Sequence, residues 1–62
     1  MKASCVEARN ILKNLHFPLT KHNVIQEAIK HGADSNIIAD LQKIPEREYT
    51  SLESVIEECG HI

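Results

Sequence analysis

Residues 17–34 read FPLTKHNVIQEAIKHGAD, and this stretch holds a turn, a helix start, an amphipathic run and a helix stop in that order. Pro18 ends the preceding helix, because proline disfavours helical geometry at the residue before it. Thr20 is a good cap for the next helix, and Gly32 ends that helix, since glycine readily adopts the left-handed conformation found after helix ends. The stretch therefore predicts one short helix with sharp limits, and the flanking chain can pack on its apolar face.

The chain before this stretch predicts a first helix that begins at Ser4 and ends near Leu15. Ser4 and Glu7 form an S-x-x-E capping box, in which each side chain takes an amide that the helix start leaves unpaired. Apolar residues repeat at three and four positions along the segment, which is the period of one helical face. Phe17 follows on the turn, and its ring is expected to point inward.

The chain after this stretch predicts two more short helices. The third begins at Asp34 or Ser35, either of which is a good cap, and ends at Pro45. The fourth begins after Thr50 or Ser51, and the sequence does not choose between these two competing caps.

No segment shows the alternation of a β-strand, so the sequence predicts an all-α fold, a compact bundle of four short helices joined by tight turns. The bundle forms a single domain over residues 1–62. Tyr49 is expected to anchor the last turn with its hydroxyl in solvent. The predicted core consists of Ala8, Leu12, Leu15, Phe17, Val24, Ala28, Ile29, Ile38, Leu41, Ile44, Tyr49, Leu52, Val55 and Ile56.

Composition indicates a globular protein. The 62 residues have a formal net charge of −2 and are 42% apolar, values that distinguish globular from disordered chains. No apolar run approaches the roughly 18–20 residues that span a bilayer, and the opening MKASCVEARN is too polar for a signal peptide. These features predict a cytoplasmic protein that makes no contact with a membrane.

The two cysteines, Cys5 and Cys59, are expected to be free thiols, because secreted folds that depend on disulfides usually have more of them. A disulfide between them would require the two chain ends to meet, and closing so long a loop would add about 4 kcal/mol. In a reducing cytoplasm we would interpret such a bond as air oxidation. Cys59-x-His61 falls short of the four ligands of an ordinary zinc site, so no metal or other cofactor is predicted.

An ordered set of residues extends through most of the chain: Phe17-Pro18-x-Thr20-Lys21, then Gly32-Ala33-Asp34, then Ile44-Pro45-x-Arg47-x-Tyr49-x-Ser51 and Val55. In order and spacing this set resembles the bacterial domain-of-unknown-function family 2795. The resemblance covers about Ile11 to Cys59, with Leu52 in place of the family's usual proline and Ile44 in place of its usual leucine. It implies a compact helical bacterial protein and no established activity.

Charge is unevenly distributed along the chain. Residues 1–33 carry a net charge of +3 and residues 34–62 a net charge of −5. The usual interpretation of the acidic part is a solvated face, and the alternative is a docking surface for a basic partner or for a second copy. A nucleophile with a paired base, a glycine-rich phosphate loop and a carboxylate dyad in a pocket are all missing from the sequence. We therefore expect that the protein is not an enzyme and that it has no small-molecule substrate.

The sequence predicts instead a non-catalytic adaptor or regulatory module that acts through protein–protein contact or self-association. Lys21 and His22 draw attention because the helix dipole disfavours cations at a helix start. The residues expected to contact a partner are Lys21, His22, Glu46, Arg47, Glu48, Glu53 and Glu57.

The alternative is a helix-turn-helix DNA-binding protein that uses the helices around Gly32. Ala28, Gly32, Ile38 and Leu41 have the spacing of such a motif, and the third helix would enter the major groove. Duplex binding normally rests on several Lys and Arg contacts, whereas residues 20–44 carry no net charge. Nucleic acid is therefore the less favoured partner. The residues that this alternative needs exposed are Ser35, Asn36, Ala39, Asp40, Gln42 and Lys43.

Overall fold

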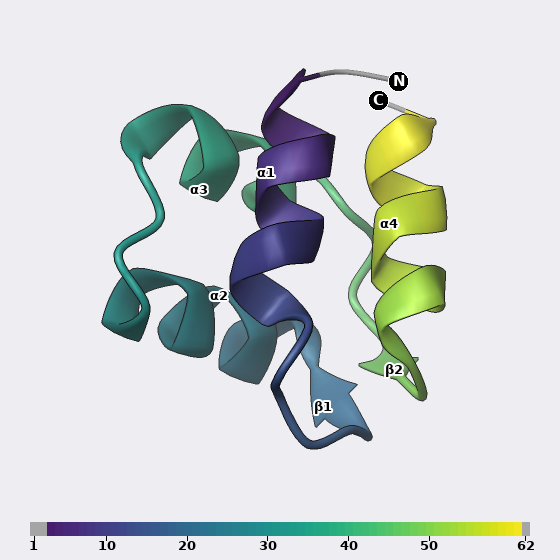
Figure 1. Ribbon diagram of the computed structural model, residues 1–62. Coiled ribbons are helices and arrows are strands. Elements are labelled where there is room, and N and C mark those ends of the chain that lie inside the picture. Colours follow the sequence, from purple (N-terminus) through teal and green to yellow (C-terminus); the bar gives the residue numbers. More distant parts are fainter. Residues whose placement is uncertain (1–2, 62) are drawn as a thin grey trace.

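The computed structural model describes residues 3–61 as four helices around one core, with a two-stranded antiparallel sheet at one end (Figure 1). The predicted architecture of four short helices is confirmed in this part of the chain. In chain order the elements are α1 (Ala3–Leu12), β1 (Leu19–Thr20), α2 (Lys21–Lys30), α3 (Ser35–Gln42), β2 (Glu48–Tyr49) and α4 (Leu52–Gly60).

The small sheet was not predicted. Leu19 pairs with Tyr49, and Thr20 pairs with Glu48. Strands of two residues are too short to show the alternating pattern by which strands are recognised in a sequence. The pairing joins the turn before α2 to the turn before α4, and it lies at the lower end of the molecule in Figure 1.

The predicted limits of α2 and the predicted start of α3 are confirmed, but α3 ends at Gln42 and not at the predicted Pro45. The side chain of Thr20 accepts a hydrogen bond from the backbone N–H of Asn23 at 3.2 Å. Asp34, rather than Ser35, caps α3 and accepts from the N–H of Ile37 at 3.0 Å. Gly32 has a φ of +87°, the left-handed conformation that its position after α2 predicted.

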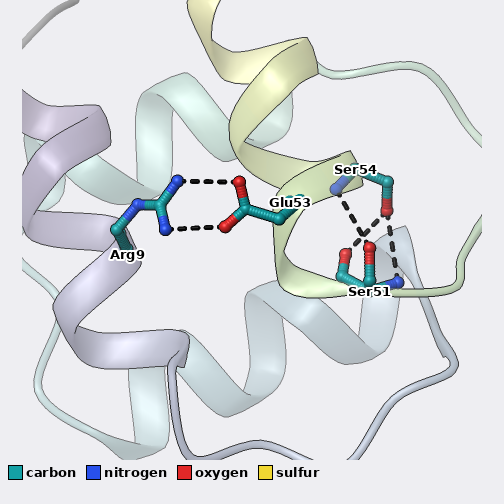
Figure 2. A network of polar contacts seen from close by, with 4 residues as sticks. All are labelled: Arg9, Ser51, Glu53 and Ser54. Atoms are coloured by element: carbon teal, nitrogen blue, oxygen red, sulfur yellow. Dashed lines mark hydrogen bonds and ion pairs between the residues drawn. The ribbon is translucent and has the colours of Figure 1, made fainter.

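The cap of α4 is Ser51 and not Thr50. Ser51 exchanges hydrogen bonds with Ser54, each side chain accepting from the backbone N–H of the other at 3.4 Å (Figure 2). This pair satisfies amides that the first turn leaves without a partner. Glu53, which would have completed a box with Thr50, is left to contact another helix.

The predicted capping box of α1 is wrong. The helix already includes Ala3, so Ser4 lies within it, and the Ser4 hydroxyl donates to the carboxylate of Asp40 on α3. A serine in a first helical turn can thus be used for a tertiary contact as well as for a cap. The helix also ends at Leu12, earlier than the predicted Leu15.

Most of the predicted core is confirmed. Leu15, Phe17, Ile38 and Leu52 are partly buried and pack against it. Ile29 was placed in the core wrongly, since it is 53% exposed. The fully or almost fully buried apolar residues are Cys5, Ala8, Leu12, Val24, Ala28, Ile37, Leu41, Ile44, Tyr49, Val55, Ile56 and Cys59.

Tyr49 also differs from expectation. Its side chain is completely buried, and its hydroxyl donates to the backbone carbonyl of Pro45 at 2.6 Å instead of reaching solvent. The hydroxyl has a partner only four residues away, so the ring can be buried without an unpaired polar group.

The cysteines are not free thiols, because Cys5 and Cys59 form a disulfide with a Cα–Cα distance of 6.0 Å. Helices α1 and α4 run antiparallel side by side, so the first turn of α1 meets the last turn of α4 (Figure 1). The prediction of two free thiols is therefore wrong. None of the helices described here has the length and apolar character needed to cross a membrane.

Candidate functional site

Two segments that are far apart in the sequence, residues 21–22 and 46–48, meet at the two-stranded sheet. The pairing of Thr20 with Glu48 sets the two segments side by side. The Lys21 ammonium group then lies 3.7 Å from the Glu46 carboxylate. Five of the seven predicted contact residues belong to these segments, and we call the surface that they form the sheet-end surface: Lys21, His22, Glu46, Arg47 and Glu48.

Lys21 has a structural role within this surface. Its side chain is only 14% exposed, and its Nζ donates to the backbone carbonyl of Gln42 at 2.6 Å. Gln42 is the last residue of α3, and the carbonyls at a helix end lack partners and carry partial negative charge. Lys21 thus satisfies the end of α3, which explains a cation at the unfavourable start of α2.

Arg47 is held against the body of the domain. Its guanidinium carbon lies 5.1 Å from the centroid of the Tyr49 ring, a cation–π distance. Its Nη1 lies 3.6 Å from a carboxylate oxygen of Glu58 on α4. Burial raises the pKa of the Tyr49 hydroxyl, while the nearby Arg47 charge opposes that rise. Arg47 therefore connects β2 to α4 while it covers the buried tyrosine.

The acidic residues of the sheet-end surface point away from the fold. The Glu46 side chain is 85% exposed although it lies near Lys21. Glu48 is exposed, and within residues 3–61 it has no ion-pair partner. His22 is exposed beside them on the first turn of α2. Lys21 is largely covered, whereas the Arg47 side chain is 51% exposed. Because both carboxylates face solvent and only one of the two cations does, the exposed charge of the surface is predominantly negative.

Glu53 is not part of this surface, although the sequence placed it in the same acidic cluster. Its carboxylate accepts two hydrogen bonds from Arg9 on α1, at 2.6 and 3.0 Å (Figure 2). Those hydrogen bonds lower the pKa of Glu53 and raise that of Arg9. The pair connects α1 to α4 at the molecular surface. Glu57 follows one turn later on α4, where it is exposed.

Two hollows in the surface were not predicted. The first, of about 360 Å³, is lined by Asn14, Leu15, His16, Leu19, Glu27 and His31. It gathers two histidines, His16 and His31, and the His31 imidazole lies 3.7 Å from the Glu27 carboxylate. The second, of about 460 Å³, lies between α1 and α3 and includes Ser4, Asn36, Asp40 and Lys43. Neither was visible in the sequence, because each depends on how distant segments pack.

The face of α3 that would read DNA is partly covered. Asp40 was predicted to be exposed, but it is only 9% exposed, and it accepts a hydrogen bond from Ser4 on α1. Asn36 and Lys43 remain exposed on either side of it. The prediction for Asp40 is wrong because α1 packs against α3, a tertiary contact with no signal in the spacing of the motif.

A third group of residues lies at the opposite end of the molecule. Cys5, Asp40 and Cys59 come from α1, α3 and α4, and their sulfur and carboxylate atoms all lie within 4.8 Å of one another. Sequence reasoning paired Cys59 with His61 as the local candidate ligands and missed Asp40. No sequence signal could have found Asp40, because it lies 35 positions from Cys5 and 19 from Cys59.

The fold and these surfaces define a small helical domain. Ion pairs and one disulfide join its helices, and local caps satisfy the helix starts. The chain belongs to a family of proteins of unknown function, DUF2795, whose model matches residues 3–56. The resemblance expected from the motifs is thereby confirmed. No curated protein and no solved structure matches the chain.

Proposed function

We propose that this domain is a non-catalytic adaptor or regulatory module, and that it binds a basic segment of another protein through the sheet-end surface. The observation that carries the proposal is the opposite placement of the charges there. Lys21 is covered and donates to the fold, and Arg47, although 51% exposed, lies against Tyr49 and near Glu58, whereas Glu46 and Glu48 face solvent. Fixed charges of one sign on a surface favour association with a partner of the opposite sign and discriminate against others.

The backbone beneath this surface supports the same proposal. Glu48 is in β2, whose pairing with β1 fixes its backbone, and Glu46 follows the Pro45 carbonyl that is bonded to buried Tyr49. A backbone that is fixed before binding loses less conformational freedom on binding than the backbone of a mobile loop. The surface is therefore suited to recognition without rearrangement.

The DNA-binding alternative has less support. Asp40 on the third helix is hydrogen-bonded to Ser4 of α1. Lys21, one of the few cations in the motif, is hydrogen-bonded to the last residue of α3. The solvent-facing carboxylates of the sheet-end surface would also repel phosphates. Duplex binding needs several cations directed at the backbone of the DNA.

A bacterial origin and a cytoplasmic location stay predictions. The first rests on the family resemblance. The cysteines no longer support a reducing compartment, because they are joined.

The proposal is tested by capturing partners from native cell lysate with three oxidised forms of the domain: the wild type, Glu48→Lys and Glu7→Lys. Both glutamates are exposed, and both substitutions change the charge equally. Glu7 lies on α1, outside the sheet-end surface, so its variant controls for net charge. We expect the wild type and Glu7→Lys to retain the same basic protein at low salt, and Glu48→Lys to lose it.

Salt provides a second criterion, because contacts between exposed charges are screened as ionic strength rises. We expect the captured protein to be released at high salt. Equal capture by Glu48→Lys and the wild type would contradict the sheet-end surface as the binding site. Enrichment of nucleic acid without protein would favour the alternative.

A further inference from the structure

We propose that the reduced form of this domain binds one zinc-like divalent cation through Cys5, Asp40 and Cys59, and that metal binding and the disulfide exclude each other. The proposal is independent of the partner surface, which lies at the other end of the helices (Figure 1). It adds a ligand, and a dependence on oxidation state, to a domain for which neither was predicted.

The geometry of the three side chains suits a tetrahedral metal. Their ligand atoms already lie within 4.8 Å of one another. Around zinc, with bonds of roughly 2.0–2.3 Å, neighbouring ligand atoms are about 3.5–3.8 Å apart. The sulfurs must therefore separate from bonding distance, and rotation about the cysteine side-chain bonds can supply this while the Cα atoms stay near 6.0 Å apart.

The chemistry of the ligands also selects the metal. Two thiolates and one carboxylate favour zinc and related cations over magnesium or calcium, which prefer oxygen ligands alone. Three protein ligands leave one position for solvent. Cys5, Cys59 and Asp40 are almost fully removed from solvent, so little bulk water competes with these three ligands for the cation.

Ser4 strengthens the case for Asp40 as a ligand. Its hydroxyl donates to one carboxylate oxygen, and a carboxylate has two oxygens with several acceptor positions. A hydrogen bond from Ser4 can therefore help to orient the carboxylate. Such outer hydrogen bonds commonly orient metal ligands.

The change from the disulfide form to the metal-binding form requires an added dithiol reductant, which supplies the electrons and protons of the reaction. Two thiol–disulfide exchanges convert the Cys5–Cys59 bond into two cysteine thiols, and the reductant leaves as its own disulfide, having supplied two electrons and two protons. The cation then displaces both thiol protons, which pass to solvent. The oxidised protein has no thiolates to offer, so it should not bind the metal.

Cobalt titration tests the proposal, because Co²⁺ bound to thiolates absorbs light and Zn²⁺ displaces it. The domain is reduced, freed of reductant without air, and titrated. We expect one Co²⁺ per chain with thiolate-to-cobalt charge transfer, displacement by Zn²⁺ and not by Mg²⁺, and no such absorption for oxidised protein. Absence of binding by the reduced protein, or equal binding by the oxidised protein, would overturn the proposal.

Two carboxylate variants on the same helix identify the third ligand. Asp40→Asn should weaken cobalt binding roughly tenfold or more, the range in which altered metal surroundings act. Asp34→Asn is the matched control, because Asp34 caps α3 and asparagine caps equally well. His61→Ala should also bind normally, since His61 is not in the cluster. Equal affinity of Asp40→Asn and wild type would refute the site.

If the reduced chain is unfolded, circular dichroism can test the proposal by measuring whether added metal restores the helices. In that case Zn²⁺ should restore the helical signal of the wild type at one equivalent, because binding energy then becomes folding energy. The Asp40→Asn variant should need a higher zinc concentration for the same recovery. No recovery for the wild type would overturn the proposal.

Discussion

Reducing the Cys5–Cys59 disulfide should lower the free energy of unfolding by about 4 kcal/mol. The bond joins residues 54 positions apart, so it closes a loop that includes almost the whole chain. For a loop of about 55 residues, the chain-entropy relation gives roughly 14 cal/mol/K, or about 4.2 kcal/mol at 25 °C. A core of this size supplies only about 3–5 kcal/mol without a staple. Reduction should therefore remove about half of the net stability.

Urea denaturation at 25 °C, followed by far-ultraviolet circular dichroism, measures this loss. The oxidised and reduced proteins are compared in the presence of a chelator, so that no metal contributes. With a denaturant slope of about 1 kcal/mol per molar urea for a small domain, the midpoint should fall by about 4 M. The double variant Cys5→Ala, Cys59→Ala is the control, and it should resemble the reduced protein and ignore added reductant.

A thiol assay on the denatured, untreated protein completes the experiment. We expect no free thiol, because both cysteines are joined in the folded chain. Equal urea midpoints for the oxidised and reduced proteins would refute the reasoning. That result would mean that helices α1 and α4 hold together without the bond and that the loop closure adds nothing to the stability of the fold.

Three further predictions concern single side chains. Tyr49→Phe should lose about 1 kcal/mol of stability, because the hydroxyl no longer bonds to the Pro45 carbonyl; an unchanged melting temperature would show that this hydrogen bond contributes little. Gly32→Ala should cost about 1 kcal/mol because its φ is positive, even though a Cβ would meet no atom within 4 Å. Gly60→Ala, at a helical position without a positive φ, should not destabilise, and equal losses would refute the backbone argument. The pKa of Glu53 is lowered from its ordinary value of 4.5. The Glu53 carboxylate therefore stabilises the fold above that pH, and this contribution is lost as the pH falls below it. In thermal melts between pH 6 and pH 3, Glu53→Gln should lose less stability than the wild type, and parallel losses would contradict the prediction.

Local signals predicted several helix limits correctly, chiefly those on either side of α2. Thr20, Asp34 and Gly32 act through hydrogen bonds and backbone conformations within four residues of themselves, so their chemistry is legible in the sequence. Ser4 has the same chemistry, but the Asp40 carboxylate of another helix takes its hydroxyl. Its capping role was therefore predicted wrongly, because a distant competitor leaves no local trace.

The candidate site was only half predictable for the same reason. Composition showed that Glu46, Glu48 and Glu53 are acidic neighbours in the sequence, but packing decides their roles. Glu53 accepts hydrogen bonds from Arg9 and so joins α4 to α1. The sheet places Glu48 beside the start of α2. The disulfide likewise required knowledge that α1 and α4 are antiparallel neighbours, whereas the small number of cysteines had suggested free thiols.

Binding at the sheet-end surface is tested most directly by amide chemical shifts of the oxidised, isotope-labelled domain mixed with the protein that it captures from lysate. We expect the largest changes at His22, Glu46 and Glu48, with little change along α3. Changes centred on Asn36 and Lys43, the exposed residues that flank Asp40 on α3, would contradict the proposed surface and restore the helix-turn-helix alternative.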